Sequence, residues 1–237
     1  MTNRDTILHF EEMNELYKHI NVPISTSNPN LHIYRFSDFT NNSIRSIQPH
    51  TKDFHQISFI EKFGSSQLNI NDRKVDQLDR VLYSISPNHI YSWRRDLDIE
   101  GYILNFKQDY LPSAPKDFQH QFSFFNLNNL NAVPVENSCE TRVAAIFEEL
   151  YTEYHKPKNR FSEEVLKHYL QIVLYKCLHL YQKRKETVGE LPISQRLFVK
   201  YKNLIDNYYL TKRTIKEYAA LLHVTPNHQS SQKSFNG

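Results

Sequence analysis

The feature that most constrains the fold is a series of short apolar segments between Leu31 and Phe106, with no helical pattern between them. Each is rich in aromatic or β-branched residues, which favour extended backbone on a half-buried surface. The segments cover residues 32–36, 54–60, 67–70, 81–85, 89–93 and 101–106. Turn residues separate them, most clearly Asn71 with Asp72 and residues 86–88. Strands at such regular spacing predict a β-sandwich or a β-barrel.

Helical periodicity marks the chain on either side of these strands. Residues 6–20 predict an amphipathic helix, and Pro23 and Pro29 break the pattern before the first strand. Residues 140–154 and 162–185 predict two longer helices. A charged segment with Gly189 and Pro192 then predicts an interdomain linker at 183–192.

The helix over residues 162–185 has a wide apolar face, which includes Leu170, Leu174 and Tyr181. Such a face is wider than a helix needs to cover a small barrel on one side, so it predicts a dimer interface. A helix packed between two elements of the same chain shows the same pattern. Both interpretations stay open on the sequence.

A capping box begins a helical motif near the end of the chain. Thr214 and Glu217 stand three residues apart, where each side chain can accept a hydrogen bond from the other's backbone N–H group. Thr225 followed by Pro226 is a second helix-start signal. A helix, a tight turn and a second helix form a helix-turn-helix, whose second helix enters the major groove of DNA. An ordinary helical hairpin would have the same spacing.

The residues of this motif are more specific than its spacing. Residues 213–219, RTIKEYA, and 222–228, LHVTPNH, resemble the first helix-turn-helix of AraC-type (AraC/XylS) transcriptional regulators. Residues 198–208 resemble the helix that precedes it in that family. The strand segments also follow the order of the cupin-like barrel with which these regulators sense a ligand, including Pro49 with His50.

The resemblance implies an α+β protein with four parts. These are an N-terminal helix and arm (1–30), a cupin-like effector-sensing β-barrel (31–130), a helical dimerisation section (136–186) and a partial α-helical helix-turn-helix domain (193–237). The protein would be a homodimeric DNA-binding transcription regulator that responds to a small organic effector.

The resemblance ends after His228. The family has an apolar anchor, usually Leu, at the next position, whereas this chain has Gln229 and then no helical apolar stripe. The family's second helix-turn-helix has no counterpart here. We therefore expect a regulator truncated within its first helix-turn-helix. Its sequence-specific DNA binding should be weak or lost, because affinity depends steeply on the number of phosphates that the protein contacts.

Particular residues take roles from this interpretation. The expected DNA-binding residues are Lys212, Arg213, Lys216, Thr225, Asn227 and His228. The expected effector-binding residues are His55, Phe59, Trp93 and Tyr102, because an apolar interior with a few polar groups suits a small organic molecule. Each of these four could equally be plain core. The expected dimer-interface residues are Leu170, Leu174 and Tyr181.

Composition limits the partners, the cysteine chemistry and the cellular location that we expect for this protein. A formal net charge of +3 permits nucleic acid as a partner without indicating it. Cys139 and Cys177 lack CxxC spacing, so neither a disulfide framework nor a zinc site is predicted. No apolar run has membrane-spanning length and no signal-peptide pattern occurs, so we expect a cytoplasmic protein that does not bind a membrane.

Two functions other than a DNA-binding regulator are also compatible with the sequence. A cupin metalloenzyme is worth testing because the chain has twelve histidines. However, no H-x-H pair occurs, His50 and His55 are separated by four residues, and the chain has no Walker, Rossmann or G-x-S-x-G pattern. We therefore expect no enzyme, no metal and no cofactor. The other alternative is a module that senses an effector or dimerises without binding DNA.

Overall fold

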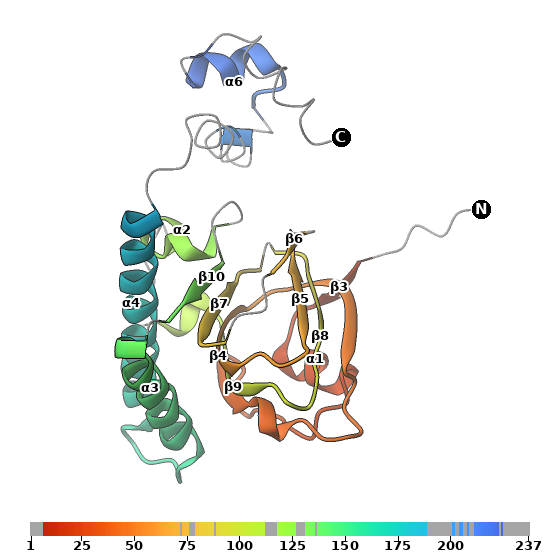
Figure 1. Cartoon of the computed structure of the whole chain (residues 1–237), viewed down its shortest axis with the longest axis vertical. Helices are drawn as coiled ribbons and strands as arrows, with labels where there is room; N and C mark the ends of the chain where they lie inside the picture. Colours follow the sequence, from red (N-terminus) through yellow and green to blue (C-terminus); the bar gives the residue numbers. More distant parts are fainter. Residues whose placement is uncertain are drawn as a thin grey trace, which may run out of the picture. The chain divides into compact units, whose positions relative to one another are not determined.

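The computed structural model (Figure 1) describes residues 7–71, 73–75, 79–87, 89–111, 118–126, 131–135, 137–188, 201, 204–205, 208, 211–222 and 224. The chain divides into two compact units, Met1–Arg184 and Lys185–Gly237. The first unit contains two β-sheets and a layer of helices. The described part of the second unit consists of helical residues with turns between them.

Ten strands of the first unit form two five-stranded sheets. The first sheet has the order β1 (Leu8–Phe10), β3 (Ser46–Lys52), β8 (Tyr91–Arg94), β5 (Gln67–Ile70) and β6 (Arg73–Lys74). The second has the order β10 (Ala132–Pro134), β7 (Val81–Ile85), β4 (His55–Lys62), β9 (Glu100–Phe106) and β2 (Leu31–Arg35). All neighbours are antiparallel except β1 and β3. Among the described strands no pairing joins the two sheets, so they form an open sandwich rather than the hydrogen-bonded closed barrel that the sequence suggested.

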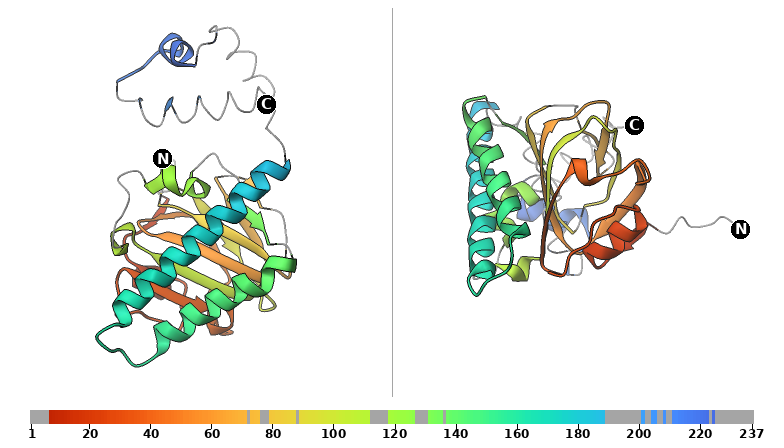
Figure 2. Two further views of the ribbon diagram at one scale, coloured as in Figure 1. Left: turned by 90° about the vertical axis from the view of Figure 1, so that its left-hand side faces the viewer. Right: turned by 90° about the horizontal axis from the view of Figure 1, so that it is seen from below.

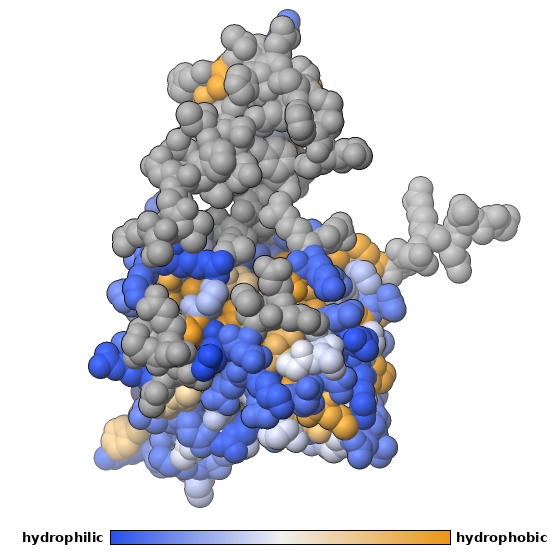
Figure 3. Space-filling model, in the orientation of Figure 1, coloured by the Kyte–Doolittle hydropathy of each residue, from blue (hydrophilic) through white to orange (hydrophobic). Residues whose placement is uncertain are grey.

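The two sheets face each other, and α2, α3 and α4 cover the outer face of the second sheet (Figures 1 and 2). The described α-helices of the first unit are α1 (Met13–His19), α2 (Phe118–Gln121), α3 (Asn137–His155) and most of α4 (Ser162–Val188), which continues past the end of the unit at Arg184. One apolar core lies between the sheets and includes residues of α1. A second core lies between the second sheet and α2, α3 and α4. The visible surface of this unit is mostly hydrophilic, with smaller hydrophobic areas (Figure 3).

Strand alternation decides which core each side chain enters. Along β4, Ile57 and Phe59 belong to the core under the helices, whereas Ile60 belongs to the core between the sheets. Neighbouring β9 alternates in the same way, with Leu104 under the helices and Ile103 between the sheets. Successive side chains of a strand point to opposite faces, so the second sheet separates two environments.

The six strands expected from the sequence are present as β2, β4, β5, β7, β8 and β9. The sequence did not predict β3, because Pro49 lies within it and proline has no N–H group for the ladder. The pairing of β3 with β8 shifts register between Ile47 and His50, and Pro49 lies at this irregularity. The expected helix over residues 6–20 is wrong in its first half, where residues 8–10 form β1 and only Met13–His19 is helical.

Gly101 occupies a position in β9 that no L-residue fits. Its φ is +127°, and a Cβ atom there would lie 2.0 Å from the carbonyl oxygen of Phe59 on β4. Gly101→Ala is therefore expected to lower the free energy of unfolding by about 2 kcal/mol or more, measured by urea denaturation. Gly64→Asn is the control, because φ of +60° is tolerated by Asn and the neighbouring atoms belong to the exposed Asp98 side chain. Equal losses in the two variants would contradict this account.

Candidate functional site

The space between the sheets contains an inner cavity of about 30 Å³. A larger pocket of about 290 Å³ lies next to it, between the segment that follows β2 and the turn from β8 to β9. Phe36, Arg95 and Ile99 line both spaces and therefore form the wall between them. The remaining residues of the outer pocket are Ser37, Phe39, Thr40, Ser43, Ile44, Arg45, Asp96 and Leu97.

Arg95 is the central residue of this wall. Its guanidinium carbon lies 3.9 Å from the ring centroid of Trp93, 4.9 Å from that of Phe39 and 5.3 Å from that of Phe36. Guanidinium groups stack favourably on aromatic faces. The Arg95 Nη1 atom is nevertheless buried without a hydrogen-bond partner among the described residues, and so is Trp93 Nε1. Arg95 and Trp93 both line the inner cavity, and each thus has a buried N–H donor without a described partner.

A chain of polar side chains continues into the core between the sheets. Lys52, which is fully buried, donates a hydrogen bond from Nζ to Oε1 of Gln56. Gln56 in turn donates to Ser58 Oγ at 2.7 Å, and Tyr91 donates its hydroxyl proton to Gln56 Oε1 at 3.4 Å. Burial lowers the pKa of Lys52 well below its ordinary value, and the charge of Arg95 lowers it further.

The four expected effector-binding residues do not lie together. Trp93 lines the inner cavity between the sheets. Phe59 and Tyr102 belong to the core under the helices, and His55 packs there against Phe106 at 5.2 Å between ring centroids. The second sheet separates Trp93 from the other three, so they cannot line one pocket. The interpretation of these three as plain core, which the sequence left open, matches their positions.

Tyr102 belongs instead to a polar cluster that joins α3 to the second sheet. Its hydroxyl donates a hydrogen bond to Glu148, and Arg35 Nη2 donates to both oxygens of the same carboxylate. The Arg35 guanidinium also lies 4.2 Å from the ring centroid of Tyr151. Burial and the neighbouring Glu148 raise the pKa of Tyr102 to about 12. These hydrogen bonds hold α3 against the second sheet, and Arg35 Nε is left buried without a hydrogen-bond partner among the described residues.

Four of the histidines that the structure describes are buried: His32, His50, His55 and His89. Burial lowers the pKa of the first three to about 3 and that of His89 to about 4, so all four are neutral near pH 7. Nδ1 of His32 is bonded to the Tyr17 hydroxyl, and Nδ1 of His89 accepts a hydrogen bond from the Ser86 backbone. Within the described ranges no three His, Cys, Asp or Glu side chains are grouped closely enough to hold a metal ion.

The second unit contains the candidate DNA-binding helix, α6 (Ile215–Leu221). The predicted capping box is confirmed: Glu217 N–H donates to Thr214 Oγ1 at 3.4 Å, and Thr214 N–H donates to Glu217 Oε2 at 2.9 Å. Beyond α6 the chain turns, and Val224 N–H donates to the Ala219 carbonyl at 3.0 Å. Tyr218 and Ala219 are buried, and Tyr218 packs edge-on against Tyr201.

Three of the expected DNA-binding residues are described. Arg213 and Lys216 are exposed and Lys212 is half-buried, so all three cations lie beside or within the first turn of α6. Thr225, Asn227 and His228 lie outside the described residues.

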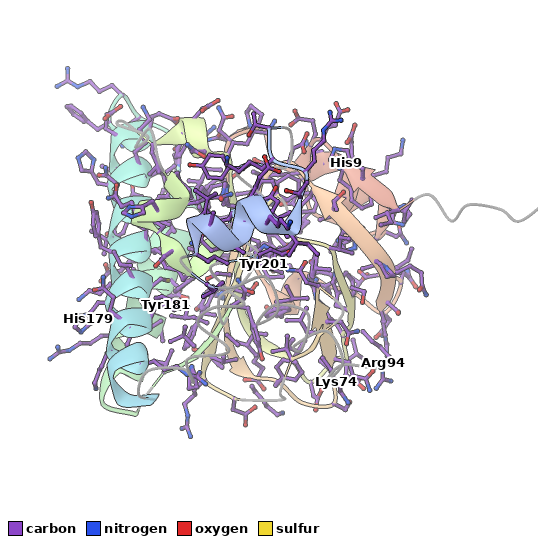
Figure 4. All side chains as sticks on the ribbon, turned by 90° about the horizontal axis from the view of Figure 1, so that it is seen from above. His9, Lys74, Arg94, His179, Tyr181 and Tyr201 are labelled. Carbon is purple, nitrogen blue, oxygen red and sulfur yellow. The ribbon has the colours of Figure 1, made fainter. Side chains whose placement is uncertain are left out.

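The expected dimer-interface residues are buried inside the first unit. Leu170 and Leu174 are each 0% exposed and Tyr181 is 8% exposed, and all three belong to the core between α4 and the second sheet. The intramolecular interpretation of this face therefore applies. Cys177 lies on the same face, and burial raises its pKa to about 12. Tyr181 and the exposed His179 project from opposite sides of α4 (Figure 4).

No described helix combines the length and the apolar character that crossing a membrane requires.

No family model matches the chain, and no curated protein matches it. Solved structures that match include the AraC-like transcriptional activator CuxR, with 12% identity, a TM-score of 0.37 and coverage of 84% of this chain. The matched region is 65% of the CuxR chain, which is less than two thirds of its length. ToxT from Vibrio cholerae also matches, with 9% identity, a TM-score of 0.35, and coverage of 83% of this chain and 72% of that chain. The chain is thus similar, at low identity, to two solved structures of which one is described as an AraC-like transcriptional activator.

Proposed function

We propose that the chain is a DNA-binding transcription regulator of the AraC type, whose first unit senses a small organic effector. The observation that carries this proposal is the agreement between α6 and the AraC-like sequence motif. The helix begins directly after Thr214, the N-cap of that motif, and the chain turns at Val224, just before the second helix-start signal of the motif. The cavity and pocket beside Arg95 are the proposed effector site.

The proposed DNA contacts involve both described and undescribed residues. Lys212, Arg213 and Lys216 would bind phosphates, which position a protein on DNA without reading its sequence. Thr225, Asn227 and His228 would face the groove. Gln229 stands where the family has an apolar anchor, so we expect the recognition helix to be poorly fixed. Binding should therefore be non-specific and weak, with a Kd on the order of 10⁻⁴ to 10⁻⁶ M.

We further propose that the protein is a homodimer in which an exposed part of α4 contacts a second copy. Ile172 and Tyr175 are large apolar side chains on that helix, and they are 44% and 53% exposed. Phe161, directly before α4, is 58% exposed. These residues replace Leu170, Leu174 and Tyr181 as the expected contact surface.

A DNA titration of the full chain tests the regulator proposal. The probes are the DNA upstream of the chain's own coding sequence and a random duplex of equal length, each followed by fluorescence anisotropy at several salt concentrations. We expect weak binding to both duplexes that decreases steeply with salt. Lys212→Gln with Lys216→Gln should reduce the salt slope by about 0.9 for each phosphate that the variant no longer neutralises. Lys156→Gln with Lys158→Gln, two exposed lysines of the first unit, should change nothing.

Two results would contradict parts of this proposal. Nanomolar binding to the upstream fragment in the presence of competitor DNA would show that recognition is intact. A titration without salt-sensitive binding would instead favour a module that senses an effector without contacting DNA.

A further inference from the structure

The space between the sheets contains basic side chains without a nearby acidic partner. Arg95 Nη1 and Trp93 Nε1 are buried donors without a described acceptor. Lys52 is fully buried, and its Nζ donates to an amide oxygen and lies over the rings of Phe54 and Tyr91. None of the described residues that line the inner cavity is acidic. Buried donors and charges normally have partners, because leaving them unpaired is unfavourable. The interior is therefore suited to an added negative charge.

Asp96, the acidic residue that lines the outer pocket, is engaged elsewhere. Its carboxylate accepts hydrogen bonds from Ser65 Oγ and from the backbone N–H of Leu97, the latter at 2.7 Å. These bonds lower its pKa, with smaller effects from Arg45 and Arg94. The groups that keep Asp96 ionised are therefore not Arg95 but its other partners.

The outer pocket offers an apolar surface next to these donors. Phe39, Ile44 and Leu97 line it, and Ile44 and Leu97 are among the large apolar side chains that remain exposed, at 40% and 55%. A volume of about 290 Å³ is at the lower end of the range of ligand pockets. It has room for about ten non-hydrogen atoms, counting one water-sized volume for each.

We propose that the outer pocket and the inner cavity together bind a small organic monocarboxylate. The carboxylate pairs with the guanidinium of Arg95 and the indole N–H of Trp93, and the hydrocarbon body lies against Phe39, Ile44 and Leu97. A planar carboxylate matches the fork of a guanidinium, and such charge-assisted hydrogen bonds are stronger than neutral ones. The apolar lining favours a hydrocarbon body over a bare inorganic anion. This inference deepens the sensing role proposed above and does not depend on DNA binding.

Trp93 gives a direct signal for the test, because it is the only tryptophan in the chain. The full chain is titrated with hexanoate and phenylacetate, and separately with hexanamide and phenylacetamide, at constant ionic strength. We expect a saturable change in Trp93 emission with each carboxylate. Each amide should bind at least about tenfold more weakly, since it has the same shape without the charge. Inorganic phosphate should give no saturable change.

Variants of two adjacent arginines assign the effect to the site. Arg95→Gln should weaken carboxylate binding at least about tenfold and leave amide binding unchanged. Arg94→Gln is the matched control, because Arg94, the last residue of β8, is exposed (Figure 4). This variant should bind the carboxylates as the wild type does. Arg95→Lys keeps the charge without the planar fork, and we expect intermediate affinity. If Arg95→Gln does not fold, Arg95→Lys carries the test through thermal-shift titration.

Three results would overturn the proposal. They are equal affinities for carboxylates and amides, unchanged carboxylate binding by a folded Arg95 variant, and the absence of any response to the carboxylates up to tens of millimolar. Each of these would leave the DNA titration interpretable, since that experiment contains no organic anion.

Discussion

Replacing Leu170 and Leu174 together by glutamate is expected to abolish folding of the first unit. Both side chains are 0% exposed and lie in the core between α4 and the second sheet. Truncating one buried leucine costs about 2–5 kcal/mol, and placing an ionised carboxylate there adds a desolvation penalty. Two such changes exceed the roughly 5–15 kcal/mol that stabilises a typical domain. Far-UV circular dichroism and the soluble fraction on expression measure the result.

The matched control introduces the same two charges on the outer side of α4. His168→Glu with Ile172→Glu keeps the spacing of four residues, and both positions are exposed. We expect this variant to fold with a change in unfolding free energy below about 1 kcal/mol. Sedimentation of this variant and the wild type also tests the homodimer proposal, since a dimer through exposed α4 residues should dissociate. A folded, stable Leu170 and Leu174 variant would show that this face is not core.

The sequence predicted most strands because their residue types and spacing are local properties. What it could not supply was the partner of each apolar surface. The face with Leu170 and Leu174 has the same pattern whether a sheet of the same chain or a second copy covers it. Only the arrangement of α4 over the second sheet distinguishes the two cases. The strand β1 was missed because Leu8–Phe10 is too short to show a period different from that of the helix after it.

The candidate site was only partly predictable for a related reason. Strand alternation alone puts Trp93 and Arg95 on the same face of their segment. On β4 it puts Gln56 and Ser58 on one face and Phe59 on the other. That signal could have separated Trp93 from Phe59 and added Arg95 to the site. It does not say which face of each strand meets the other sheet, because that depends on pairings between residues far apart in the sequence. The pairing of β4 with β9, for example, joins Phe59 to Tyr102.

Lowering the pH from 7 to 5 is expected to remove much of the stability of the first unit. His32, His50, His55 and His89 are at most 4% exposed. Burial lowers their pKa values to about 3 or, for His89, about 4, from an ordinary value of 6.5. At pH values between the lowered pKa and the ordinary pKa, the unfolded chain binds protons that the folded chain does not. Stability is therefore complete above pH 6.5 and decreases as the pH falls below it.

The expected loss of stability follows from the same pKa shifts. Each buried histidine should lose about 2 kcal/mol of stability between pH 7 and pH 5, and the four together approach the whole stability of a typical domain. Urea denaturation at pH 7, 6 and 5 measures this as a falling midpoint. A midpoint that stays constant over this range would show that these histidines take up protons in the folded protein.

One substitution assigns part of the effect to a single residue. His55 packs against three phenylalanine rings, with centroid distances of 5.2 Å to Phe106 and 4.8 Å to Phe118 and Phe125, and its Nδ1 has no described partner. His55→Phe should therefore fold and reduce the loss between pH 7 and pH 5 by about 2 kcal/mol. His179→Phe, at an exposed position of α4, is the matched control and should leave the pH dependence of the wild type unchanged. If both variants follow the wild-type curve, the proton uptake that destabilises the fold does not occur at His55.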